Sequence, residues 1–265
     1  MEKSNIGEKI KLLTGSGMWH TREAEKLPSV HLSDGPHGLR KQEEKERQNN
    51  VSLVSTCYPT ASALACSWDV TAAERLGRAV AKEAWNADVA VLLGPGINMK
   101  RSPLCGRNFE YFSEDPFLAG RLGAAYVSAA QGEDVAVSLK HFAANNQETN
   151  RQTSNSQIDE RALREIYLSA FEYVVKTARP ATVMASYNRL NGYYACENRH
   201  LLTEILREEW GFDGVVISDW GACADLAKAV KAGMDLEMPD SHGIHARKLK
   251  AALKAGEISE ADIAQ

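Results

Sequence analysis

From about residue 68 onward, the sequence alternates long segments of helical periodicity with short runs of apolar and β-branched residues. The first amphipathic segment covers 68–88 and leads into the apolar run VAVLLGPG at 89–96. The later runs lie at 134–140, 181–188, 214–220 and 235–239, and the later helical segments at 117–131, 159–178, 200–209, 222–233 and 244–254. Because the runs are almost continuously apolar, they predict strands buried on both faces of a parallel sheet.

Repeated βα units build either an open, doubly wound sheet or a closed (β/α)8 barrel. Polar and titratable residues follow the ends of several predicted strands, and a barrel draws its active site from the C-terminal ends of different strands. No G-x-G-x-x-G or G-x-x-x-x-G-K-[ST] turn occurs, although an open nucleotide-binding sheet relies on such turns. The sequence therefore predicts an α/β fold of the (β/α)8 TIM-barrel type.

The two ends of the chain are less regular than its middle. The first 67 residues contain one predicted helix at 5–15, the segment SDGPHGLRKQ and a charged loop at 43–50, which predict irregular first strands. Near the other end, Ser259 with Asp262 three residues later predicts a helix start, but only about six residues follow. So short a helix is marginal unless it is packed or continued, so we expect a truncated barrel; a frayed natural terminus is the alternative. No repeat or linker divides 1–265, which predicts one domain.

Composition excludes several classes of protein. The chain has 265 residues and a net charge of -4, with no basic block, which argues against a nucleic-acid partner. No apolar run approaches the roughly 18 residues of a membrane span, and the charged start MEKSNIGEKIKLL is unlike a signal peptide, so we expect a cytoplasmic protein. The five cysteines are widely spaced without a C-x-x-C pair, which predicts reduced, packed thiols rather than a zinc site or disulfides.

Asp219 is the sharpest candidate for a catalytic residue. It follows the apolar run 215–218 and precedes Trp220, so its carboxylate is expected at the barrel mouth beside an aromatic wall. Such a carboxylate can attack a sugar's anomeric carbon or stabilise a cationic centre there. The alternative is an N-cap for the helix that begins near Ala222, and this segment alone leaves both interpretations open.

Three other segments are rich in groups that bind polar ligands. Lys140 and His141 close a buried run and need a partner or a ligand, because an unpaired buried charge is costly; a salt-bridged lysine beside a structural histidine is the alternative. SDGPHGLR (33–40) and GRNFEYFSEDP (106–116) add further charged and aromatic residues, and a plain turn and an exposed polar loop are their respective alternatives.

Together these segments resemble one family. SDGPHGLR, GRNFEYFSEDP, KHFAANNQETNR, SYN and VISDWGA occur in the order and at the approximate spacing found in the N-terminal barrel domain of glycoside hydrolase family 3, which includes many bacterial β-glucosidases. The resemblance implies that Asp219 is the nucleophile of a retaining glycosidase that needs no metal or organic cofactor. It also implies a set of substrate-binding residues: Asp34, Arg40, Arg107, Lys140, His141, Arg151, Met184, Tyr187 and Trp220.

A retaining glycosidase needs a second carboxyl group about 5 to 5.5 Å from the nucleophile. In the two-domain β-glucosidases that this chain resembles, a second α/β domain after the barrel supplies that acid/base, and no such domain lies within 1–265. The N-acetylhexosaminidase branch carries its acid/base in a loop that KHFAANNQETNR does not match. Glu110, Glu148 and Glu237 are weak local substitutes. We therefore expect an incomplete site, a missing domain in cis or in trans, and self-association through uncovered apolar surface.

The resemblance thus implies hydrolysis of terminal β-D-glucosyl residues from a β-glucoside or oligosaccharide. Two alternatives stay open: a carbohydrate-binding barrel without turnover, and a truncated product without a function of its own. β-Xylosidases of the family share most of these motifs, and glucose is preferred because two segments, KHFAANNQETNR and SDGPHGLRKQ, look like the glucosidase form.

Overall fold

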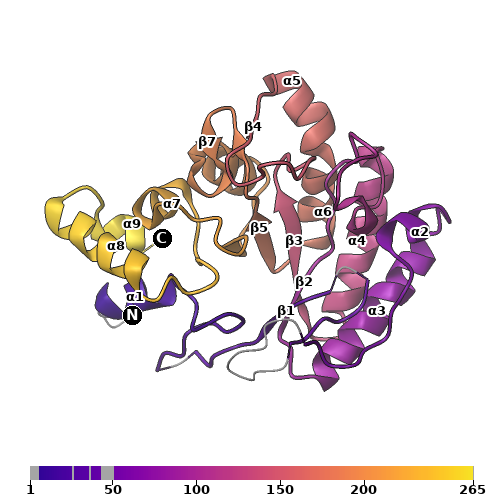
Figure 1. Ribbon diagram of the computed structural model, residues 1–265, viewed down its shortest axis with the longest axis horizontal. Coiled ribbons are helices and arrows are strands. Elements are labelled where there is room, and N and C mark those ends of the chain that lie inside the picture. The colour runs from indigo at the N-terminus through magenta and orange to yellow at the C-terminus, as the bar shows by residue number, and fades with distance from the viewer. Residues whose placement is uncertain (1–5, 26, 36, 43–50, 265) are drawn as a thin grey trace.

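A five-stranded parallel sheet forms the centre of the molecule (Figure 1). The computed structural model describes residues 6–25, 27–35, 37–42 and 51–264. The strand order is β1 (Leu32–Asp34), β2 (Val91–Leu93), β3 (Ala136–Phe142), β5 (Thr182–Ala185) and β8 (Val215–Ser218). Because the strands are parallel, their C-terminal ends meet at one edge, where the predicted site residues follow them.

Single backbone contacts extend this sheet beyond β8. Leu236 forms a parallel bridge with Ile217, Glu237 forms one with Thr14, and the amide of Leu32 in β1 donates to the carbonyl of Trp19 at 2.8 Å. A path of backbone hydrogen bonds thus returns to β1 through the irregular segments 236–237 and 13–20. The predicted strand at 235–239 is reduced to these bridges, and the predicted irregularity at the N-terminal side of the barrel is confirmed.

The two faces of the strands bury different sets of residues. Val91, Leu93 and Ile217 belong to a small inner cluster, whereas Leu92 and Val216 belong to the large core that packs against the helices. Side chains of a strand alternate between faces, so a residue two positions beyond an inner one also points inward. Asp219 follows Ile217 in this way, and the same alternation carries Asp34 and Lys140 to the inner face of β1 and β3.

The helices pack against the outside of the sheet. On one side lie α3 (Val70–Asn86), α4 (Pro116–Gln131) and α6 (Ser169–Ala178), in contact in that order (Figure 1). Two of them begin at aspartate caps, since Asp69 accepts a hydrogen bond from the amide of Thr71 and Asp115 accepts one from the amide of Phe117. Among the residues with a described placement, no helix combines the length and the apolar character that crossing a bilayer requires.

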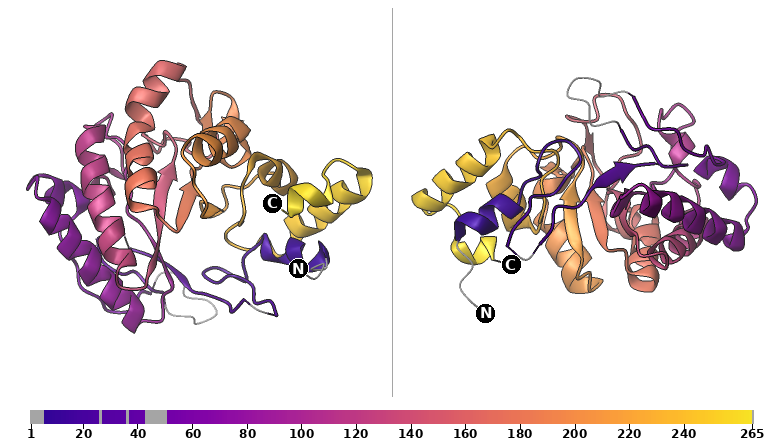
Figure 2. Two further views of the ribbon diagram at one scale, coloured as in Figure 1. Left: turned by 180° about the vertical axis from the view of Figure 1, so that it is seen from behind. Right: turned by 90° about the horizontal axis from the view of Figure 1, so that it is seen from below.

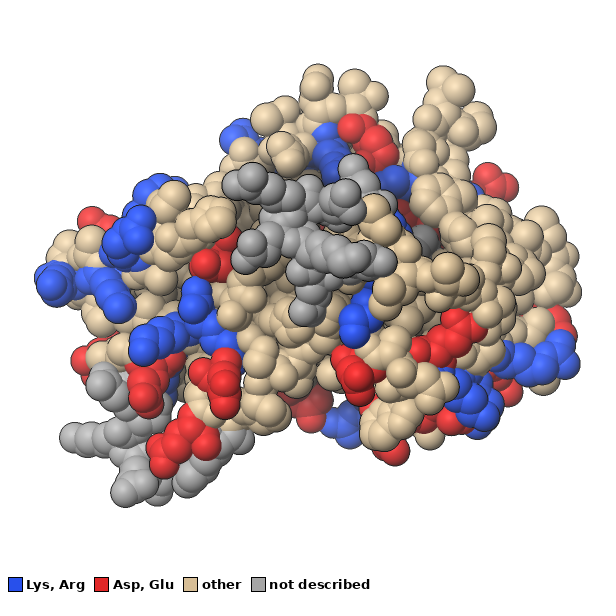
Figure 3. All heavy atoms as spheres, turned by 60° about the horizontal axis from the view of Figure 1, so that its bottom comes forward, with Lys and Arg blue, Asp and Glu red and all other residues tan. Residues whose placement is uncertain are grey.

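Both ends of the described chain lie in a second group of helices (Figures 1 and 2). This group contains α1 (Ile6–Leu12), α7 (Leu226–Ala232), α8 (Ile244–Ala255) and α9 (Glu260–Ile263). The predicted cap at Ser259 is confirmed, because its hydroxyl accepts from the amide of Asp262, whose carboxylate accepts from the amide of Ser259. Positive side chains gather over α8 at the left of Figure 3, so this helix presents a basic face to solvent.

Shorter elements complete the fold. They are α2 (Ala61–Ala65), η1 (Asn108–Glu110), β4 (Asn155–Ser156), α5 (Glu160–Ala162), η2 (Leu163–Tyr167), β6 (Arg189–Leu190), β7 (Tyr193–Tyr194), η3 (Ala195–Glu197) and η4 (His200–Glu209). The helix predicted at 159–178 is divided into α5, η2 and α6. The helix predicted at 222–233 begins only at Leu226, because Asp225 caps it. The charged loop predicted at 43–50 lies outside the described residues.

Candidate active site

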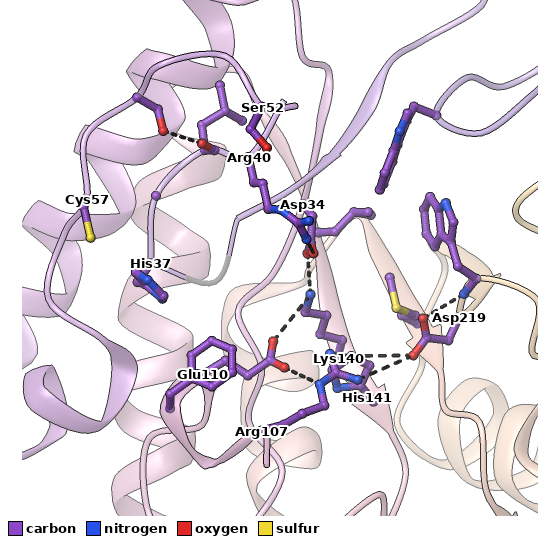
Figure 4. A pocket seen from close by; sticks show the side chains of 18 of the residues that line it. Asp34, His37, Arg40, Ser52, Cys57, Arg107, Glu110, Lys140, His141 and Asp219 are labelled. Atoms are coloured by element: carbon purple, nitrogen blue, oxygen red, sulfur yellow. Dashed lines mark hydrogen bonds and ion pairs between the residues drawn. The ribbon is translucent and has the colours of Figure 1, made fainter. Parts of the chain in front are cut away.

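A cavity of about 670 Å³ opens at the C-terminal edge of the sheet (Figure 4). All ten residues predicted for the site from the sequence line it. They come from the ends of β1, β3, β5 and β8 and from the loops after these strands and after β2, where Arg107 directly precedes η1. The structure therefore brings the predicted residues together around one cavity.

Lys140 is the buried cation at the centre of the cavity. Only 3% of its side chain is exposed; its Nζ lies 2.8 Å from Asp34 Oδ1 and 3.7 Å from Glu110 Oε2. Burial by itself would lower the pKa of Lys140, but the two carboxylates outweigh this and raise it. Burial likewise opposes ionisation of Asp34, yet Lys140 holds the pKa of that carboxyl below its ordinary value. Asp34 also lies 3.8 Å from the more exposed guanidinium of Arg40.

Arg107 connects this pair to the opposite side of the cavity (Figure 4). Its Nε donates to Glu110, its Nη2 lies 2.7 Å from Nε2 of His141, and its Nη1 lies 4.0 Å from Oδ2 of Asp219. A guanidinium cannot accept a hydrogen bond, so it donates to His141, whose Nε2 is the acceptor. We therefore assign the ring proton of neutral His141 to Nδ1.

The environment of His141 agrees with that assignment. Its Nδ1 lies 3.0 Å from the hydroxyl of Tyr111 and can donate to it. Burial, followed by the positive charges of Arg107 and Lys140, lowers the pKa of His141 well below its ordinary value. The ring is thus neutral at pH 7, and although its Nε2 lies 3.7 Å from Asp219, it carries no proton to share with that carboxylate.

The two carboxylate oxygens of Asp219 differ, because one is hydrogen-bonded and the other is contacted by the more distant Arg107 and His141. Oδ1 accepts from the amide of Trp220 at 2.7 Å, whereas buried Oδ2 has no hydrogen-bond partner among the described residues. Burial raises the pKa of Asp219, and Arg107 offsets only part of this effect. The helix-cap alternative is wrong, because Asp225 caps α7. Asp219 therefore presents an unoccupied carboxylate oxygen, as attack on an electrophilic carbon requires.

Aromatic side chains form the wall beside this carboxylate. The Tyr187 hydroxyl donates to the carbonyl of Trp220 at 2.9 Å, and the guanidinium of Arg151 lies over the Tyr187 ring at 4.3 Å. Trp220 packs against Trp19, with their ring centroids 5.2 Å apart. Buried Met184 on β5 completes the lining. A flat apolar wall beside a carboxylate suits the C–H face of a sugar ring.

Sequence reasoning missed Trp19, which lines the cavity, and Tyr111, which is buried behind it against His141. Trp19 lies in the irregular N-terminal segment, and nothing in the local pattern indicates a contact with Trp220 about 200 positions away. Tyr111 lies within GRNFEYFSEDP, and its role depends on the unforeseen approach of His141. The signal that could have indicated Tyr111 is general: a buried tyrosine hydroxyl needs a partner.

The local acid/base candidates are poorly suited to donate a proton. Glu110 lines the cavity but faces the cations Arg107 and Lys140, whereas a proton-carrying carboxyl needs an apolar or acidic environment. Glu148 pairs with Arg151 at 2.9 Å, and Glu237 hydrogen-bonds His245; neither lines the cavity. The described residues thus supply one carboxylate with the surroundings of a nucleophile and no matching acid.

Comparison with known families decides where this barrel belongs. The model for the glycosyl hydrolase family 3 N-terminal domain matches residues 36–265. The chain belongs to glycoside hydrolase family 3. Its fold is the family's N-terminal (β/α)8 domain: it superposes on β-glucosidase 3B of Thermotoga neapolitana in complex with glucose with a TM-score of 0.93 at 40% identity, covering 98% of this chain and 40% of that one.

Family 3 relatives of this chain carry more than one activity in their names. It is 52% identical to thermostable beta-glucosidase B of Acetivibrio thermocellus over 98% of this chain and 35% of the relative. It is 50% identical to exo-alpha-(1->6)-L-arabinopyranosidase of Bifidobacterium longum over 89% of this chain and 32% of the relative. The chain thus spans about a third of the length of these relatives.

Proposed function

We propose that this chain is the nucleophile-bearing barrel of a retaining β-glucosidase, with Asp219 as the nucleophile. The observation that carries the proposal is Asp219 Oδ2, a buried carboxylate oxygen that has no hydrogen-bond partner among the described residues and lies at a cavity lined by charged and aromatic side chains. The beta-glucosidase names of the relatives support the same reaction class.

In the proposed reaction, Asp219 Oδ2 attacks the anomeric carbon of a bound β-glucoside and displaces the aglycone oxygen. A covalent glycosyl-enzyme forms, and water then releases glucose with net retention. Arg107 stabilises the carboxylate before attack, and Trp220 and Tyr187 flank the ring. The charged groups of Asp34, Lys140, Arg40 and Arg151 bind hydroxyl groups, since charged hydrogen bonds discriminate strongly against a missing hydroxyl.

We propose that the acid/base lies outside these 265 residues. The cations beside Glu110 and the position of Glu148 and Glu237 outside the cavity support this assignment. The chain's coverage of about a third of its relatives is consistent with a further domain over the barrel mouth. Apolar surface at an uncovered mouth favours self-association of the isolated chain.

Glucose is the proposed glycone, and a pentopyranose is the second candidate. One relative at 50% identity is named an arabinopyranosidase, and β-xylose differs from β-glucose only by the hydroxymethyl group. A missing methylene-sized group changes transition-state binding by about 1–3 kcal/mol, so closely related sites can differ in preference. Rates of p-nitrophenol release from p-nitrophenyl β-glucoside, β-xyloside and α-L-arabinopyranoside would rank the candidate glycones.

The test of the nucleophile uses a substrate with a good leaving group, because such a group departs without a proton donor. 2,4-Dinitrophenyl 2-deoxy-2-fluoro-β-glucoside is expected to release one equivalent of dinitrophenol and to label the peptide that contains Asp219. Asp219→Asn is expected to abolish release, while Asp213→Asn, which removes an exposed surface carboxylate, is expected to react normally.

Each outcome separates the candidate functions. A label on another carboxylate would refute the assignment of Asp219. Binding of glucose in calorimetry without any labelling would favour the binding-only barrel. If a folded chain neither binds glucose nor becomes labelled, the interpretation that remains is a truncated product without a function of its own.

A further inference from the structure

A cluster of three possible metal ligands lies outside the cavity. Cys223 follows β8, Glu237 lies in the irregular segment bridged to β8 through its neighbour Leu236, and His245 is the second residue of α8. None of the three lines the proposed active site. The cluster thus joins three separate elements near the outer side of the barrel.

The geometry of the cluster is close to that of a bound cation. One donor atom from each residue lies within 4.8 Å of the other two. Ligands of a tetrahedral zinc ion, bound at 2.0–2.3 Å, are about 3.4 Å apart. To enclose an ion, the donor atoms would have to adjust their spacing, and the hydrogen bond between Glu237 and His245 would have to open.

Glu237 provides a second, independent indication. It is 3% exposed, and its Oε2 has no hydrogen-bond partner in the described structure, whereas its Oε1 lies 2.5 Å from Nδ1 of His245. A buried carboxylate oxygen without a donor is costly, and a cation would remove this cost.

We propose that Cys223, Glu237 and His245 bind a divalent zinc-like cation, with water as the fourth ligand. The combination of thiolate, imidazole and carboxylate selects zinc over magnesium or calcium, which prefer all-oxygen sites. Binding displaces the thiol proton of Cys223 to solvent, and the thiolate and carboxylate then balance the two charges of the ion. Half-buried His245 leaves a path from solvent.

The bound ion would fix the start of α8 to the barrel. Gly243 precedes α8 and has no side chain to cap it, so among the described residues a single side-chain hydrogen bond, from the amide of His245 to the hydroxyl of Ser241, holds the first turn. Leu249 and Ala252 are the residues of α8 that are buried, so few contacts hold it. A metal at His245 adds a link from its first turn to Glu237.

Cobalt(II) is the probe for this site, because thiolate-to-cobalt charge transfer absorbs in the near ultraviolet. We expect one equivalent of cobalt to produce this absorption and zinc to displace it. Cys223→Ser is expected to abolish the absorption and to weaken zinc binding in calorimetry at least about 10-fold. Cys66→Ser changes an exposed cysteine elsewhere and is expected to behave as the unmodified chain.

A second measurement follows folding directly. Zinc is expected to raise the melting temperature of the unmodified chain and of Cys66→Ser, and not that of Cys223→Ser. Glu237→Gln is expected to weaken zinc binding as well. If Glu237→Gln fails to fold, the comparison of Cys223→Ser with the unmodified chain still tests the proposal. Absence of the cobalt absorption, or its persistence in Cys223→Ser, would overturn the proposal.

Discussion

Replacing Lys140 by Met tests the electrostatic centre of the cavity. The substitution keeps the apolar stem but removes the ammonium that lies 2.8 Å from Asp34 and 3.7 Å from Glu110. Removing one partner of a buried ion pair costs about 3–5 kcal/mol, because the remaining charge stays desolvated. Glu110 retains Arg107, and Asp34 is 28% exposed and partly hydrated. We therefore expect Lys140→Met to lower the free energy of unfolding by about 3 kcal/mol at pH 7, the lower end of that range.

The loss of unfolding free energy caused by Lys140→Met should depend on pH. Because the pKa of folded Asp34 is lowered, its contribution to stability is complete above the unfolded value of 3.8 and disappears as pH falls through the folded value. Because the pKa of Lys140 is raised, its contribution is complete below 10.5 and disappears as pH rises through the folded value. The difference between Lys140→Met and the unmodified chain should therefore be largest near neutrality and narrow in acid.

Urea denaturation followed by circular dichroism measures this difference, and a double-mutant cycle with Asp34→Asn isolates the pair. Lys176→Met is the matched control, because it breaks an exposed pair with Glu172 and should cost no more than about 0.5 kcal/mol. A loss below about 1 kcal/mol for Lys140→Met, or a coupling energy with Asp34→Asn near zero, would refute the reasoning.

Three further predictions follow from the same structure. Because burial raises the pKa of Asp219, the rate of labelling by the fluoro-sugar should fall in acid around a pKa above 3.8, and a midpoint at or below 3.8 would contradict this cause. Gly233→Ala should cost about 1–3 kcal/mol in urea denaturation, because φ is +103° and a Cβ would lie 2.7 Å from Thr203 Oγ1; Gly256→Ala, which meets no such atom, should cost less. Phe142→Ala removes a fully buried ring and should cost about 3–5 kcal/mol; a loss below about 1 kcal/mol would mean that the ring is not packed in solution.

The strands and long helices could be predicted because their signals are local. The run at 181–188 contains β5, the run at 134–140 overlaps β3, which continues to Phe142, and the helix at 200–209 has the predicted bounds. The segment at 235–239 was harder to predict, because an isolated bridge and a regular strand have the same apolar pattern. The start of α7 was predicted too early, because either Asp219 or Asp225 could cap it from the sequence alone. In the structure Asp225 is the cap, and Asp219 lies in the cavity.

The sequence predicts that Lys140 and Asp219 follow the C-terminal ends of buried strands, and therefore that they meet at one edge of the sheet. Alternation turns these two side chains inward, but their neighbours His141 and Trp220 also line the cavity, because the strands become irregular where they end. The pairing of these groups with one another depends on the tertiary structure. Lys140 pairs with Asp34 from 106 positions away, while Oδ2 of Asp219 has no hydrogen-bond partner among the described residues, since hydrogen bonds and burial depend on distances that no local pattern encodes.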